Sequence, residues 1–134
     1  MHNKILVPLA LDHGLSHKLF AVARGLLLPA GEILALHVVE TAFGIAKATE
    51  SEAQAQSAFD RAHDMMKDKL DGEKNIHGHV KEGHIYRSII EFADKHAVNC
   101  IVMGSHKPGL SDFFLGSTAA RVVRHATCAV HVHR

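Results

Sequence analysis

The sequence predicts a single α/β domain with a mostly parallel sheet covered by helices on both faces. Short apolar runs typical of buried strands alternate along the 134 residues with segments whose apolar positions recur at helical spacing. This alternation indicates successive strand–helix units, which place their strands in parallel. A chain of this length buries an adequate core without metal or disulfide staples. In such open sheets, ligands bind beyond the carboxyl ends of the strands, at the crevice where the strand order reverses.

Five apolar runs are expected to form the strands. The first run ends near Pro8, where a missing N–H group does least harm to the hydrogen-bond ladder. The third run alternates weakly and carries Lys81 and Glu82, so we expect it at an edge of the sheet. The fourth run, NCIVM, fits a strand that is buried on both faces. The five runs are residues 4–9, 33–39, 76–82, 99–103 and 128–133.

Four amphipathic helices are expected between these runs. Ser16 is placed to cap the first helix, which Pro29 and Gly31 should terminate. The second helix follows overlapping capping-box patterns within residues 49–54 and ends at Gly72. The apolar faces of the four helices fall within residues 19–27, 55–70, 85–93 and 119–126, and segments 10–15 and 41–50 are expected to be loops.

The segment after the fourth strand combines several features of an anion-binding loop. The strand stops at Gly104, and a polar loop that contains Lys107 follows it. Residues 116–118 (GST) then open the fourth helix. Free backbone N–H groups and the positive end of a helix dipole favour an anion, and glycines let the backbone approach it. The alternative is a plain connection in which Ser117 only caps the helix.

Composition and charge argue against several function classes. The formal net charge of +1 disfavours a general binder of nucleic acid or membrane surfaces, because these need a clustered basic face. No stretch approaches the ~20 apolar residues of a membrane span. The N-terminal run ILVPLAL is too short and interrupted for a signal peptide. Cys100 and Cys128 lie in apolar runs, so we expect buried free thiols, as in a protein of a reducing cytoplasm.

Thirteen histidines raise the hypotheses of a metal site and of pH sensing. His131 and His133 share one face of the last expected strand, and His125 is close in sequence. A symmetry-related copy would bring four imidazoles together on Zn or Ni, although no carboxylate lies near to orient them. A Ser-His-Asp grouping within residues 105–112 is disfavoured, since a catalytic triad needs its members held rigidly by separate elements.

Four blocks of the sequence form a recognisable set, of which the last is the most specific: KILVPL at 4–9, LHV at 36–38, IVMGSH at 101–106 and LGSTAARVVRHATCAVHV at 115–132. On these blocks the chain resembles the universal stress protein family over essentially its whole length. The resemblance implies a five-stranded fold with sheet order 3-2-1-4-5, so that the first and fourth strands border the crevice. It also implies ATP or AMP binding through a Gly-x-x-Gly-x9-Gly-Ser/Thr loop and, as in many members, a dimer formed through the last strand.

The chain departs from the family pattern in two places. Gly104 and Gly116 match the outer glycines, but the interval between them is one residue shorter than the motif requires. Lys107 stands at the second glycine position, with Gly109 only nearby, so the loop GSHKPGLSDFFLGS resembles a variant subgroup, some of whose members still bind nucleotide. Ala10 stands where the family often has Asp. The binding residues that the resemblance implies are Pro8, Leu9, Ala10, Val38, Met103, Gly104, His106, Lys107, Gly109, Gly116, Ser117 and Thr118.

The resemblance also implies roles for these residues. Met103 and Val38 would flank the adenine, while the Gly116 N–H and the hydroxyls of Ser117 and Thr118 would meet the phosphates. The expected function is a cytoplasmic nucleotide-binding stress module that acts by conformation or partner choice. The alternative is a dimeric interaction protein of the same fold that binds no nucleotide. Slow ATP hydrolysis or self-phosphorylation is the weaker hypothesis, because the missing carboxylate at position 10 leaves Mg²⁺ ligation uncertain.

The last expected strand, residues 128–133, predicts a homodimer. One side of this strand has no partner within the chain, and the run carries no Lys, Pro or inward charge to discourage pairing. An antiparallel mate would continue the sheet. His131 and His133 would then approach their symmetry copies, and protonation near pH ~6.5 would place like charges together. We therefore expect a dimer that loosens in mild acid.

Overall fold

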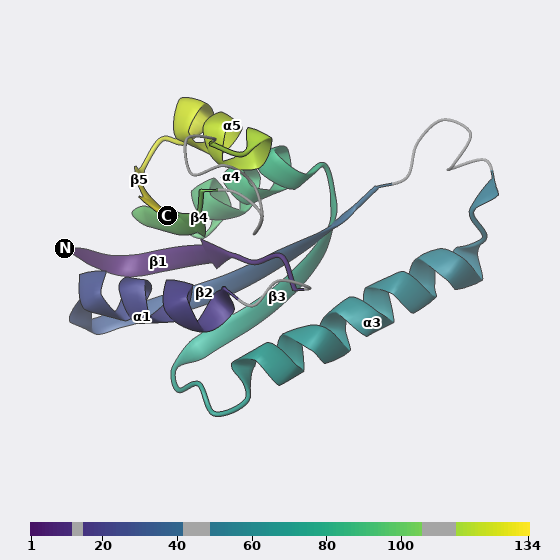
Figure 1. Ribbon diagram of the computed structural model, residues 1–134, viewed down its shortest axis with the longest axis horizontal. Coiled ribbons are helices and arrows are strands. Elements are labelled where there is room, and N and C mark those ends of the chain that lie inside the picture. The colour runs from purple at the N-terminus through teal and green to yellow at the C-terminus, as the bar shows by residue number, and fades with distance from the viewer. Residues whose placement is uncertain (12–14, 42–48, 106–114) are drawn as a thin grey trace.

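The computed structural model describes residues 1–11, 15–41, 49–105 and 115–134, and within them strands and helices alternate as the sequence predicts (Figure 1). The elements in chain order are β1 (His2–Pro8), α1 (Ser16–Leu26), β2 (Leu27–Glu40), α3 (Glu52–Leu70), β3 (Ile76–Gly83), α4 (Ile85–Lys95), β4 (Cys100–Gly104), α5 (Ser117–His125) and β5 (Ala129–His133). Most of the expected loop at 41–50, and the middle of the one at 10–15, lie outside the described residues.

The five strands form one parallel sheet in the order β3-β2-β1-β4-β5, which confirms the expected topology. β3 lies at one edge, as its charged, weakly alternating sequence predicts, and β5 lies at the other. The strand order reverses between β1 and β4, because the chain leaves β1 toward β2 on one side and returns to β4 on the other. This switch point sets the expected position of a ligand crevice.

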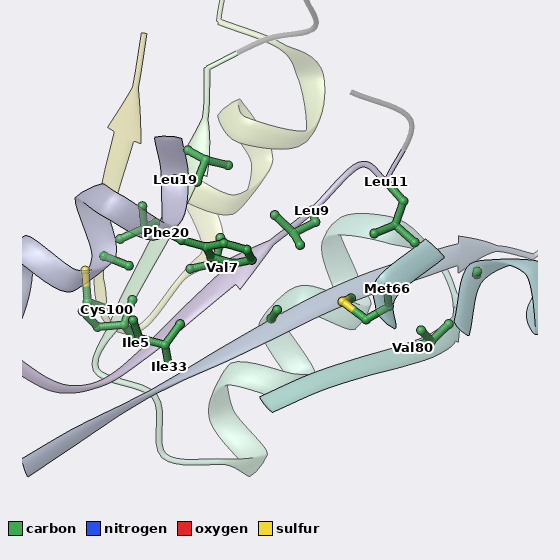
Figure 2. Packing of buried hydrophobic residues seen from close by; sticks show 14 residues of the cluster. Ile5, Val7, Leu9, Leu11, Leu19, Phe20, Ile33, Met66, Val80 and Cys100 are labelled. Atoms are coloured by element: carbon green, nitrogen blue, oxygen red, sulfur yellow. The ribbon is translucent and has the colours of Figure 1, made fainter. Parts of the chain in front are cut away.

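Alternate strand residues build one core on each face of the sheet. Ile5 and Val7 face the core between the sheet and helices α1 and α3, and Figure 2 is a close view of this core. Leu6 faces the other core, between the sheet and helices α4 and α5. The helices therefore cover both faces, as Figure 1 shows. Among the described residues, Phe20 of α1 is the largest side chain that is fully buried. None of the described helices is long and apolar enough to cross a membrane.

The second strand is longer than the sequence predicts. Pro29 and Gly31 were expected to end the first helix, but α1 already ends at Leu26 and β2 begins at once. The pairing of β2 with β1 is irregular between His2 and Lys4, and Pro29 lies in that interval, where it disturbs no regular ladder. A Cβ on Gly31 would come within 2.8 Å of a β1 carbonyl, so glycine allows the two strands to approach.

The expected helix caps are confirmed in one place and wrong in two. Ser51 caps α3 in a complete capping box with Gln54. Ser16 is not a cap, because Leu15 holds that position and Ser16 is the first residue of α1. Ser117 is not a cap either, since Gly116 precedes α5 in the capping position. In both wrong cases the cap lies one residue earlier than expected and offers no side-chain hydrogen bond.

Both cysteines are free thiols. Cys100 is buried, whereas Cys128 is only half-buried and immediately precedes β5 instead of opening it. Burial raises the pKa of both thiols, so neither is activated as a nucleophile.

Candidate functional site

A cavity of about 320 Å³ lies at the switch point, beyond the carboxyl ends of β1 and β4. The cavity is lined by residues from the carboxyl-terminal parts of β1, β2 and β4, from the N-terminal turns of α1 and α5, and from one face of α4. Its lining residues are Pro8, Leu9, Ala10, Leu15, Ser16, Leu19, Leu36, His37, Val38, Ile85, Ile89, Met103, Gly104, Ser105, Gly116, Ser117, Thr118 and Ala119. The chain thus brings together segments as far apart in the sequence as Pro8 and Ala119, as a doubly wound sheet requires.

The structure gathers every described residue of the expected site in this lining. Pro8, Leu9 and Ala10 come from the end of β1 and the residues after it, and Val38 comes from β2. The cavity is also lined by Met103 and Gly104 of β4 and by Gly116, Ser117 and Thr118 at the start of α5. His106, Lys107 and Gly109 lie outside the described residues.

The N-terminus of α5 opens onto the cavity without a side-chain cap. Gly116 holds the capping position, and the first turn contains no acidic residue. The first N–H groups of a helix have no acceptor within the helix, so those of Ser117 and Thr118 are available to an external acceptor. Together with the positive end of the helix dipole, they make this part of the lining suited to an anion.

Ser105 fixes the start of α5 to the sheet. Its carbonyl accepts a hydrogen bond of 2.6 Å from the Gly116 N–H, and its own N–H donates to the His133 carbonyl at 2.9 Å. Ser105 is buried, and its position after Gly104 is the only feature of the sequence that points to this role. Backbone bonds between distant residues depend on tertiary structure, which local sequence pattern does not reveal.

His37 holds the end of β1 beside the cavity. Its Nδ1 donates to the Leu9 carbonyl at 2.8 Å, and the Leu9 N–H donates to the Leu36 carbonyl at 2.8 Å. These two bonds continue the β1–β2 contact one residue beyond Pro8, which has no N–H to donate. The position of His37 within the LHV block was noted in the sequence, but its contact with Leu9 was not expected.

The N-terminus of α1 contributes a second uncapped helix end. Leu15 forms no side-chain capping bond, and the first turn of α1 contains no acidic residue. Ser16, the first helical residue, lines the cavity with its Oγ buried. The sequence placed Ser16 at this helix end but did not connect it with the site.

Most of the described lining is apolar and uncharged. It includes no Lys, Arg, Asp or Glu, and His37 is its one titratable side chain. Leucine, isoleucine, valine and methionine side chains from both faces of the sheet make an apolar wall, while polar groups concentrate at the starts of α1 and α5. Such a lining, apolar with a few placed polar groups, is typical of a small-molecule site.

The described histidines form no metal site within one chain. Across the described ranges no group of three His, Cys, Asp or Glu side chains is placed to hold an ion. His125 stacks on Tyr86 of α4, with ring centroids 5.6 Å apart. His131 and His133 lie on the edge strand β5, and their approach to a second copy stays a prediction.

The model of the Universal stress protein family matches residues 1–134 of the chain. The universal stress protein of Methanothermobacter thermautotrophicus is 28% identical, over an alignment that covers 100% of this chain and 97% of the relative.

Two solved structures show the same fold. The universal stress protein UspA from Lactobacillus plantarum has a TM-score of 0.71 at 24% identity, covering 99% of this chain and 98% of its own. The universal stress protein from Archaeoglobus fulgidus in complex with dAMP has a TM-score of 0.57 at 18% identity, covering 98% of this chain and 97% of its own.

Proposed function

The chain belongs to the universal stress protein family, and on that premise we propose that its cavity binds an adenine nucleotide. The observation that carries the proposal is the N-terminus of α5, which opens onto the cavity with neither a side-chain cap nor an acidic residue in its first turn. Phosphate groups bind readily at such helix ends, because the N–H groups and the dipole both favour negative charge.

The cavity fits a nucleotide in size and in the distribution of its polar groups. Its volume of about 320 Å³ lies at the lower end of the range for small-molecule sites, about 300–1,000 Å³. In the proposal, Val38 and Met103 flank the adenine ring. The phosphates meet the N–H groups and the hydroxyls of Ser117 and Thr118. The Gly116 N–H, which the resemblance also implied as a phosphate donor, is already bonded to the Ser105 carbonyl. His106, Lys107 and Gly109 are proposed to complete the phosphate-binding loop.

ATP and AMP are both candidate ligands. The Archaeoglobus fulgidus relative was solved with dAMP, which supports a nucleotide of the adenine type. Ala10 and the rest of the described lining offer no carboxylate, so the proposal assigns no Mg²⁺ ligand among these residues. Binding, and not hydrolysis, is therefore the activity proposed, with a role in the stress response through conformation or choice of partner.

A homodimer through β5 is part of the same proposal. Among the described strands, β5 pairs only with β4 and lies at the edge of the sheet, so one side of its backbone has no described strand beside it. Exposed edges of this kind favour pairing with another chain.

Calorimetric titration of the purified chain with ATP, ADP and AMP tests the proposal. We expect heat of binding and one nucleotide per chain, and native mass spectrometry should show the same complex as a dimer. Absence of binding to all three nucleotides would refute the nucleotide function. A dimer that never carries nucleotide would instead support the alternative function, a dimeric interaction protein that binds no nucleotide.

A further inference from the structure

Ser16 presents an unexplained feature of the cavity wall. Its residue is only 3% exposed, and its Oγ is the one buried side-chain polar atom without a hydrogen-bond partner in the part of the chain that the structure describes. A buried hydroxyl without a partner destabilises a fold, because it has lost its hydrogen bonds to water. Since Ser16 lines the cavity, a bound molecule is in a position to supply the missing partner.

The surroundings of Ser16 indicate which part of a ligand it would meet. It opens α1, next to Leu15, whose Cδ1 lies 3.7 Å from the ideal Cβ position of Gly104. The start of α1 therefore lies beside the end of β4. The phosphates are proposed to lie at the start of α5, so the nucleoside is the part of the ligand left to meet the start of α1. Ser16 Oγ is a neutral donor and acceptor with no charged side chain in the described lining, and it suits a neutral hydrogen-bonding group.

We propose that Ser16 Oγ hydrogen-bonds a neutral group of the nucleoside part of the ligand, either a ribose hydroxyl or a ring nitrogen of the base. The inference rests on the proposed nucleotide function and adds a specificity-determining residue to it. The start of α5 takes the phosphates, and Ser16 at the start of α1 recognises the nucleoside. The serine keeps an unsatisfied hydroxyl in the free protein and satisfies it on binding.

Ser16→Ala tests the inference by calorimetry and thermal unfolding together. Removing an unpartnered hydroxyl should leave the melting temperature of the free protein unchanged or higher. Affinity for ATP should fall about three- to tenfold, as expected for the loss of one neutral hydrogen bond. Ser57→Ala, at an exposed serine of α3, is the matched control and should leave ATP affinity unchanged. A serine with only a structural role would change stability without changing affinity.

Further probes separate the possible contacts. Inorganic tripolyphosphate lacks the nucleoside, so Ser16→Ala should bind it as well as the wild type does. An equal loss for tripolyphosphate and ATP would place Ser16 at the phosphates and overturn the inference. If Ser16 contacts the ribose, one analogue, 2′-deoxy-ATP or 3′-deoxy-ATP, lacks the contacted hydroxyl. The Ser16→Ala variant and the wild type should bind that analogue equally well. With a base contact, the penalty should persist for both deoxy analogues and disappear for the 1-deaza, 3-deaza or 7-deaza analogue of ATP that lacks the contacted ring nitrogen.

Ser16→Cys provides a second variant if the alanine protein folds poorly. The thiol keeps the shape of the side chain but is a much weaker hydrogen-bonding group, so ATP affinity should again fall. If wild type binds ATP and both variants bind it equally well, the inference is wrong while the nucleotide function stands. If the wild type binds no nucleotide, the proposed function itself has failed.

Discussion

Replacing Gly116 with valine tests whether phosphate binds at the start of α5. Gly116 has φ −58° and ψ 154°, a backbone conformation that any residue adopts, so the new side chain causes no backbone strain. The hydrogen bond from the Gly116 N–H to the Ser105 carbonyl is also retained. The substitution therefore acts by placing methyl groups where a phosphate would approach the first N–H groups of the helix.

The expected loss of affinity for Gly116→Val can be estimated from the contacts that it blocks. A phosphate at this helix end gains charge-assisted hydrogen bonds from first-turn N–H groups, each worth about 1.5–3 kcal/mol. Loss of two such bonds costs about 3–6 kcal/mol, so ATP affinity should fall at least a hundredfold. The free energy of unfolding should fall by only about 0.5–1 kcal/mol, because valine is a poorer N-cap than glycine.

Calorimetric titration with ATP and thermal unfolding of Gly116→Val measure these two quantities. Gly25→Ala is the matched control, since Gly25 lies in α1 and its ideal Cβ position has no atom within 4 Å. The control should stabilise the protein by roughly 0.5–1 kcal/mol and leave ATP affinity unchanged. If Gly116→Val binds ATP within about threefold of the wild type, the phosphates do not lie at this helix end.

Three further predictions follow from the caps, the sheet edge and the histidines. Ser117→Ala should weaken ATP binding with almost no change in melting temperature, because Gly116 and not Ser117 holds the capping position; lost stability with intact affinity would contradict a phosphate contact. Val130→Pro should give a monomer by light scattering, because proline disturbs β5 and removes a backbone donor; a monomeric wild type would refute the interface. The pKa of His79 is lowered from 6.5 by burial and by the nearby His96, Lys81 and His77. The neutral His79 ring therefore makes its full contribution to stability above pH 6.5, and this contribution is lost as the pH falls through the lower pKa of the folded state. The unfolding free energy of His79→Gln should therefore depend less on pH in this range. An identical profile for the variant would contradict this assignment.

The buried strands were the part of the fold that the sequence predicted best. Runs such as 99–103 are apolar throughout because helices cover both faces of β4, and this burial leaves a clear pattern. The sheet order came from the resemblance and not from periodicity, since no residue pattern states which strands are neighbours. The sequence does not predict that β2 begins at Leu27, because Pro29 and Gly31 are typical of helix ends. In the structure both residues lie where the pairing of β2 with β1 is irregular.

The candidate site was predicted where it follows the ends of strands and the start of α5. The parts contributed by Leu15, Ser16, Ile85 and Ile89 were missed, because they enter the cavity through helix packing. A serine before an apolar helix predicts a cap, and only tertiary structure distinguishes a capping hydroxyl from one that is buried in a cavity wall. The corrected positions of Ser16 and Ser117 follow from a shift of one residue at each helix start.

The two backbone bonds of Ser105 have a consequence for the relation between ligand and assembly. One bond reaches Gly116 at the start of α5, and the other reaches His133, the last residue of β5. A movement of the helix start on ligand binding would therefore reach the strand through which the dimer is proposed to form. The two equilibria would then be coupled, and the coupling must be reciprocal. If nucleotide changes the dissociation constant of the dimer by a given factor, dimerisation changes the affinity for nucleotide by the same factor.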